Sequence, residues 1–151
     1  MMSLKNIVLK LFFSILFLFL FCAICFSKTV EVGMWSNFQG KKNNMRYDPR
    51  IISINVGDTV FWKSLGKDHN VEFIVEGIPV GVEKLNSELN QDVEFTFITP
   101  GIYAYVCTLH INIGMIGFVV VGGDKSNLEN IKKIRFSARS KKIAPDLINS
   151  L

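Results

Sequence analysis

Cysteine and histidine are scarce in this chain, which has three cysteines and two histidines among its 151 residues. Cys22 and Cys25 lie in an N-terminal apolar run, so a domain that follows this run contains Cys107 alone. A single cysteine excludes an internal disulfide. The thiol of Cys107 is therefore either an inert, buried apolar group or a group with a chemical role.

The chain also lacks a basic stretch interleaved with aromatic residues, the pattern typical of nucleic-acid binding. Its net charge of +4 does not come from its central part. Residues 28–124 carry eight basic and eleven acidic side chains, a net charge of −3, whereas residues 125–151 carry seven basic and two acidic ones, a net charge of +5. We expect no nucleic-acid partner, and we interpret the basic tail as a solvated helix face.

The N-terminus has the pattern of a secretory signal peptide over residues 1–27. Two lysines precede the apolar run 11–26, small residues follow, and polar sequence begins at Lys28. This pattern predicts cleavage near the bond between Ser27 and Lys28. An uncleaved anchor helix is the alternative, but the run is at the lower edge of the length that spans a bilayer.

Short segments rich in β-branched and aromatic residues dominate residues 28–124. Turn sequences such as Pro100-Gly101 and Gly122-Gly123 separate them. Seven short strands in about 95 residues predict an all-β sandwich, large enough to bury one core without a disulfide. The expected strands are Thr29–Met34, Ile51–Asn55, Thr59–Trp62, Val71–Val75, Val93–Thr99, Ile102–Val106 and Ile116–Val121.

After residue 124 the apolar spacing becomes helical. Ser126 followed by Glu129 is a capping-box signature. A rough helical stripe follows, made of Leu128, Ile131, Ile134 and Phe136. Pro145 predicts the start of a second helix, with an apolar side of Leu147, Ile148 and Leu151. We expect residues 125–151 to form a helical hairpin that packs on the sandwich; a disordered basic tail is the alternative, which these apolar residues disfavour.

One short loop carries three side chains that bind metals well. In the stretch YAYVCTLHINIGMIGFVVV, Cys107, His110 and Met115 supply a thiolate, an imidazole and a thioether between two predicted strands. His69, in GKDHNVEF, lies beside a different strand. A lone histidine there is usually structural, but one cysteine, two histidines and an axial methionine are the ligands of a mononuclear blue-copper site. Together the four residues predict a site for one type 1 copper ion per chain.

Around these ligands the sequence resembles the cupredoxin family of blue copper proteins, and within it the pseudoazurin group. The segments GDTVFW…DHNVEF and TPGIYAYVCTLHINIGMIGFVVVG are similar to the family's two ligand segments, and YDPRIISINVGD is similar to the segment that leads into its third strand. The spacing of His69 and Cys107 and the helical tail suit this group. The resemblance covers residues 29–150 and implies a Greek-key cupredoxin sandwich.

The resemblance implies a small periplasmic electron carrier rather than an enzyme. Copper would alternate between Cu(I) and Cu(II), bound by His69, Cys107 and His110 with Met115 as a weak axial ligand. Asn70, next to His69, resembles the family residue that ties the two ligand loops together. The resemblance places Met45 near the exposed histidine, although core packing explains this methionine equally well.

Redox partner proteins are also implied by the resemblance. A nitrite reductase or a cytochrome is expected to dock at an apolar patch around His110, made of Leu109, Ile111, Ile113, Gly114 and Ile116. The family often has lysine before the cysteine and proline before the second histidine, where this chain has Val106 and Leu109. Of the basic docking ring found in the family, this chain has only Lys67, Lys84, Lys41 and Lys42, which weakens the case for a nitrite reductase as its partner. We expect a monomer with no stable membrane association after signal cleavage.

Two functions of other classes could use the same residues. A copper homeostasis protein that stores or delivers the metal would exchange copper quickly, which a complete and closed ligand set disfavours. A hydrolase with Cys107 as nucleophile would need a base and a third orienting group, and no such third group is apparent. A binuclear copper centre would need a second cysteine in the loop, and there is none.

Overall fold

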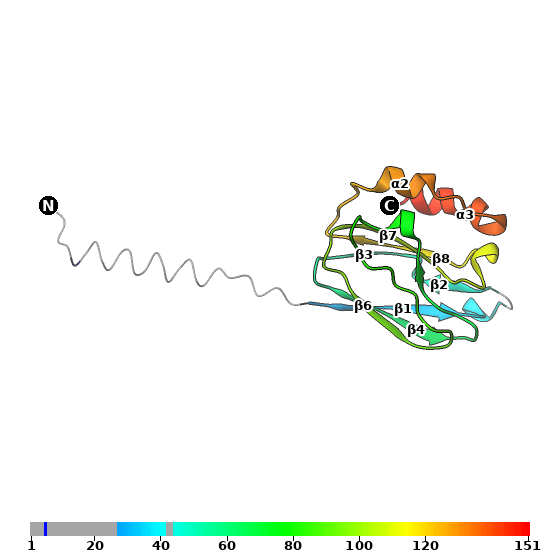
Figure 1. Ribbon diagram of the computed structural model, residues 1–151. Coiled ribbons are helices and arrows are strands. Elements are labelled where there is room, and N and C mark those ends of the chain that lie inside the picture. Colours follow the sequence, from blue (N-terminus) through cyan, green and yellow to red (C-terminus); the bar gives the residue numbers. More distant parts are fainter. Residues whose placement is uncertain (1–4, 6–26, 42–43) are drawn as a thin grey trace.

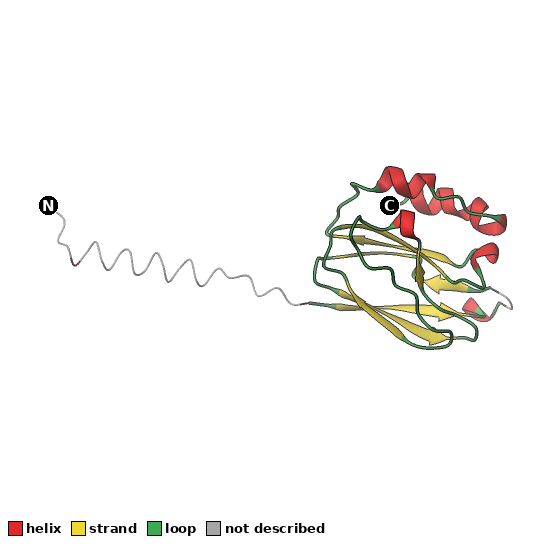
Figure 2. Cartoon of the chain, viewed as in Figure 1, coloured by secondary structure: helices red, strands yellow, loops and turns green. Residues whose placement is uncertain are grey.

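The computed structural model describes residue 5, residues 27–41 and residues 44–151. The predicted signal peptide, residues 1–27, lies almost wholly outside this part of the chain. Within the described residues, no helix has the length and apolar character needed to cross a membrane. The described chain forms two stacked β-sheets with helices against the outer face of one of them (Figures 1 and 2).

The strands of the described part divide equally between the two sheets. The first sheet has the order β2-β1-β4-β6, and β1 runs parallel to β4. The second has the order β3-β8-β7-β5, and β7 and β8 are antiparallel, with Val106 opposite Ile116. The bounds are β1 (Thr29–Trp35), β2 (Arg46–Asp48), β3 (Ile51–Ile54), β4 (Thr59–Leu65), β5 (Glu72–Phe73), β6 (Val93–Thr96), β7 (Gly101–Val106) and β8 (Ile116–Val121). The predicted β-sandwich is confirmed.

The predicted strands differ from the observed ones mainly at their ends. Strand β5 stops at Phe73 because the chain turns into the 3₁₀ helix η2 (Val75–Gly77), and β6 stops at Thr96. Strand β2 was not expected from the sequence. It has three residues, and its buried Tyr47 lies between two charged side chains, so it lacks the apolar run that marks a strand.

Aromatic side chains fill the space between the sheets. Trp62 packs edge-to-face on Tyr105, with ring centroids 5.3 Å apart, and Phe97 packs edge-to-face on Tyr103 at 4.7 Å. Offset and edge-on arrangements of this kind stabilise aromatic cores beyond their buried area. Cys107 and Met115 belong to the same buried cluster, so the candidate ligand loop is anchored directly in the main core.

Two helices, α2 (Leu128–Lys133) and α3 (Ala138–Asn149), cover the outer face of the second sheet (Figures 1 and 2). Because helices cover one face and the first sheet the other, β7 and β8 are buried along their whole length. This second core contains Ile102, Ala104, Val106, Ile116, Phe118, Val120, Ile131 and Ala144. Residues of both helices therefore share a buried cluster with β7 and β8.

Two details of the predicted helices were wrong. The residue before α2 is Asn127, and Ser126 hydrogen bonds to the side chain of Asp124 instead of forming a capping box. Pro145 lies inside α3 and does not begin it. The buried face of α3 already starts at Ser140, so packing on the ligand loop and the second sheet keeps the chain helical through the proline despite its missing N–H.

Candidate metal centre

Three of the predicted ligands converge at one end of the sandwich. His69 lies in the loop before β5, Cys107 follows β7, and His110 precedes the 3₁₀ helix η3 (Ile111–Ile113). Nδ1 of His69 is 3.2 Å from Nδ1 of His110, and Sγ of Cys107 is 3.3 Å from the same His110 atom. The candidate ligand atoms of the three residues all lie within 4.8 Å of one another.

The fourth candidate, Met115, closes the loop that carries Cys107 and His110. The N–H of Cys107 donates to the carbonyl of Met115 at 3.1 Å, and the N–H of Met115 donates to the carbonyl of His110 at 3.1 Å. Antiparallel pairing of β7 with β8 brings both ends of this loop together. The side chain of Met115 is fully buried in the core cluster that contains Cys107.

Hydrogen bonds around Ser36 fix the ring of His69. Oγ of Ser36 lies 2.9 Å from Nε2 of His69 and accepts the N–H of Lys67 at 3.1 Å. If Nε2–H of His69 donates to Ser36, Nδ1 keeps its lone pair and faces His110. A side chain added at Gly66 would come within 2.9 Å of Nε2 of His69 and closer still to Ser36, so glycine is required for this close approach.

Asn70 joins the two ligand segments, as expected from the resemblance. Its Oδ1 accepts the backbone N–H of Thr108 at 2.9 Å and the Thr108 hydroxyl at 3.1 Å. Its Nδ2 donates to the carbonyl of Ser87 at 3.4 Å. The residues that follow His69 and Cys107 are therefore tied to each other, with Asn70 buried and Thr108 exposed.

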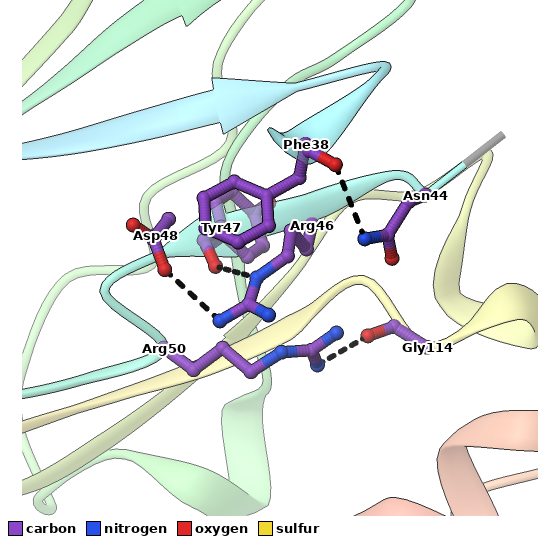
Figure 3. A network of polar contacts seen from close by, with 7 residues as sticks. All are labelled: Phe38, Asn44, Arg46, Tyr47, Asp48, Arg50 and Gly114. Carbon is purple, nitrogen blue, oxygen red and sulfur yellow. Dashed lines mark hydrogen bonds and ion pairs between the residues drawn. The ribbon is translucent and has the colours of Figure 1, made fainter. Parts of the chain in front are cut away.

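A pair of arginines lies beside the ligand loop (Figure 3). Arg50, just before β3, donates from Nη1 to the carbonyl of Gly114 at 2.6 Å, while Arg46 pairs with Asp48 at 2.9 Å. Burial lowers the pKa of Arg50 to about 10, with a further contribution from the charge of Arg46. The guanidinium of Arg50 stays protonated near neutral pH and holds the residue that precedes Met115.

Burial sets the protonation of the donors. It lowers the pKa of His69 to about 4, to which the charge of nearby His110 also contributes, while Asp68 acts in the opposite direction. Burial likewise lowers the pKa of His110. It raises the pKa of the Cys107 thiol, partly opposed by backbone N–H groups, the first being that of Asn70. At neutral pH the metal-free site therefore holds two neutral imidazoles and one thiol, and a bound metal displaces the thiol proton.

The low pKa of His69 predicts that the copper-free protein is less stable in acid. The unfolded chain binds a proton near pH 6.5 and the folded chain only near pH 4, so stability is full above pH 6.5 and falls as the pH drops toward 4. We expect a loss of about 2–3 kcal/mol across this window. Urea unfolding of copper-free wild type and His69→Gln, measured in parallel from pH 4 to 7, checks this. Carboxylates titrate in both proteins, so a difference between the two stability curves comes from His69. Parallel stability curves would contradict it.

The donor set determines which metal the site fits. A thiolate and two imidazoles suit copper or zinc, whereas an added thioether selects copper. Two unprotonated Nδ1 atoms 3.2 Å apart would repel each other unless a proton or a metal ion lies between them. The residues present therefore fit a single copper ion.

Several residues that shape the site were not found from the sequence. Ser36 contacts His69 across 33 residues of the chain, Arg50 contacts Gly114 across 64, and Thr108 contacts Asn70 across 38. Serine and threonine occur in every loop and carry no distinctive spacing. Only a resemblance could have singled them out, as it did for Asn70.

The predicted docking features are only partly present. Leu109 is 58% and Ile113 is 39% exposed, but Gly114 and Ile116 are buried and do not belong to a surface patch. Lys84 forms an ion pair with Glu72 at 2.5 Å, whereas Lys67 is exposed. Met45 packs against the main core, and Lys42 lies outside the described residues.

Comparison with known proteins finds relatives over most of this chain. Residues 35–122 match the family model described as copper binding proteins, plastocyanin/azurin family. The pseudoazurin of Paracoccus pantotrophus is 34% identical over 116 residues, which are 77% of this chain and 79% of that protein. The pseudoazurin of Methylorubrum extorquens is 30% identical over 112 residues, 74% of this chain and 76% of that protein.

Solved structures resemble the whole fold. The crystal structure of pseudoazurin from Methylobacterium extorquens AM1 superimposes with a TM-score of 0.75 and 29% identity, over 81% of this chain and 98% of that one. Native pseudoazurin from Hyphomicrobium denitrificans gives a TM-score of 0.74 and 29% identity, over 82% and 98%. The aligned parts cover more of this chain than residues 35–122 do, so the similarity extends beyond the sandwich.

Proposed function

This chain belongs to the plastocyanin/azurin family of copper-binding proteins and, with its pseudoazurin relatives, is a type 1 copper electron-transfer protein; we propose that His69, Cys107, His110 and Met115 bind its single copper ion. The convergence of two imidazole nitrogens and one thiol in a buried site supports this assignment. Bound copper supplies one-electron chemistry, alternating between Cu(I) and Cu(II).

Residues of this chain hold the proposed ligands in position in the metal-free protein. Ser36 orients the ring of His69, and Asn70 ties the two ligand segments. The surrounding core excludes water from Cys107 and Met115, both fully buried. A site held in one shape by packing and hydrogen bonds changes little between oxidation states, which suits electron transfer.

A reductive titration tests the proposed function. Protein reconstituted with Cu(II) should take up one copper per chain and one electron per copper, and reoxidation should restore the starting spectrum. Copper that cannot be reduced and reoxidised without leaving the protein would contradict the proposal. Storage or delivery of copper is not favoured, because the family and the relatives are electron carriers and three of the four proposed ligands, His69, Cys107 and Met115, are fully buried.

Loss of the Ser36 hydroxyl should weaken copper binding. Ser36→Ala leaves Nε2 of His69 without its partner at 2.9 Å, and residues that orient a ligand typically contribute ten- to a hundredfold in affinity. We expect affinity for Cu(II) to fall at least about tenfold, measured by competition with a chelator. Ser53→Ala, at an exposed serine on β3, is the matched control, and equal affinities in both variants would contradict this role of Ser36.

Electrons are proposed to pass through His110 to a partner protein. Its ring is partly exposed whereas His69 is fully buried, so His110 is the imidazole ligand closer to solvent. Exposed Leu109 and Ile113 lie beside it, and an exposed apolar patch on a soluble protein marks a contact surface. The partner, a cytochrome or a nitrite reductase, docks transiently with a small interface. In this role the chain itself is not an enzyme and acts as a monomer.

The protein is further proposed to act in the periplasm after loss of residues 1–27, with residues 28–124 as the copper domain and residues 125–151 as its helical cover. Backbone N of Lys28 lies 2.8 Å from Oδ1 of Asp58, whose pKa is lowered by this and a second backbone bond. Cleavage before Lys28 would place the new terminal ammonium on this carboxylate. N-terminal sequencing of exported protein should begin at or near Lys28; retention of residues 1–27 would contradict cleavage.

A further inference from the structure

The C-terminal helix α3 contacts the ligand loop through two serines. Ser140 is fully buried, and its hydroxyl donates to the carbonyl of Ile111. Ser137 lies immediately before α3, and its hydroxyl donates to Oδ1 of Asn112 at 2.5 Å. Ile111 and Asn112 are the two residues that follow His110. One helix, more than 20 residues away in the sequence, therefore holds the loop between the two ligands His110 and Met115.

Neither serine makes the local hydrogen bond that its position in the chain favours. Serine before a helix usually accepts a backbone N–H of the first turn, but Ser137 makes no such side-chain cap. Serine within a helix commonly bonds a carbonyl one turn earlier, but the Ser140 hydroxyl bonds Ile111 instead. Their hydroxyl groups contribute to the ligand loop and not to the helix that carries them.

Close packing reinforces these hydrogen bonds at Gly114. Its φ of +100° favours glycine, and a Cβ there would lie 3.0 Å from the side chain of Ile143 and 3.6 Å from that of Arg139. From another direction, Nη1 of Arg50 donates to the Gly114 carbonyl (Figure 3). The segment between His110 and Met115 is thus held by α3 and by Arg50.

We propose that α3 is a brace for the copper loop, with Ser140 as its main positioning residue and Ser137 as a second. The inference rests on the proposed ligand role of His110 and Met115. The His110 carbonyl accepts the N–H groups of both Ile113 and Met115, each at 3.1 Å. Movement of the η3 turn would therefore change the position of Met115 relative to His110. The brace fixes this spacing in the metal-free protein and in both oxidation states.

Amide hydrogen exchange of the copper-free protein tests the brace independently of metal binding. In Ser140→Ala the amides of Gly114 and Met115, which donate to carbonyls within the loop, should exchange about tenfold faster, because the carbonyl of Ile111 loses one of its two partners. Ser137→Ala, at an exposed position, should show a smaller acceleration at the same amides without loss of folding. Ser150→Ala is the control, since that hydroxyl bonds within α3.

A spectroscopic readout separates positioning from general stability. In copper-loaded Ser140→Ala, the Cu(II) charge-transfer spectrum and the reduction potential should both shift, while those of Ser150→Ala stay as in wild type. Unchanged exchange at Gly114 and Met115 in both loop-facing variants would overturn the brace. So would faster exchange with an unchanged spectrum and potential. Failure of wild type to bind copper would instead overturn the proposed function, and the exchange result would still stand.

Discussion

Cys107→Ser is expected to abolish the intense blue colour of the copper-loaded protein. The colour arises from charge transfer out of a thiolate to Cu(II), and an alcohol oxygen cannot replace that sulfur donor. Cys107 is the only cysteine in the described part of the chain and is fully buried beside both histidines. Visible spectra of equal amounts of wild type and variant, each with one equivalent of Cu(II), check this.

Met115→Leu is the matched control, because it alters the proposed axial ligand and leaves the thiolate in place. This variant should stay blue and have a higher reduction potential, since a weak donor to Cu(II) is removed. A blue Cys107→Ser protein would show that the thiol is not the ligand. A colourless Met115→Leu protein that still binds copper would show that Met115 has a larger role than a weak axial donor.

Leu109→Asp is expected to slow electron transfer to a partner at least about tenfold while the copper site stays intact. Leu109 is 58% exposed, two residues from Cys107 and next to His110. A docked partner would cover this side chain. Burying an unpaired carboxylate in a dry contact costs more free energy than corresponds to a tenfold change in partner binding. Stopped-flow reduction by a cytochrome, with the visible spectrum recorded for each protein, gives the rate.

Ile98→Asp is the control for added charge at an apolar surface position. Ile98 is 75% exposed and lies before β7, whereas Cys107 lies after it, so the two are at opposite ends of that strand. This variant should transfer electrons at the wild-type rate. If Leu109→Asp reacts as fast as Ile98→Asp at all salt concentrations, electrons do not pass through the surface around His110.

Much of the fold follows from local patterns in the sequence. Alternating and β-branched segments locate seven strands, since half-buried strands impose a period of two. The pattern fails at β2, where three residues around Tyr47 form a strand through pairing with β1. It also fails at Pro145, because the packing of α3 on the second sheet outweighs a local signal that usually begins a helix.

The four proposed ligands could be selected from the sequence for a different reason: they are rare residue types with a distinctive spacing. Cys107, His110 and Met115 lie in one loop, and His69 is the only other histidine. The residues that hold them could not be found in this way. Ser36 and Ser140 act through common hydroxyl groups, and only the folded chain brings them to His69 and Ile111.

The crystal structure of the copper-loaded protein, with anomalous diffraction recorded at the copper absorption edge, would show directly which residues bind the metal. One copper peak per chain is expected, bound by Nδ1 of His69, Nδ1 of His110 and Sγ of Cys107, with the sulfur of Met115 as a more distant fourth neighbour. A peak elsewhere, a second peak of equal height, or a Met115 sulfur turned away from the metal would contradict it.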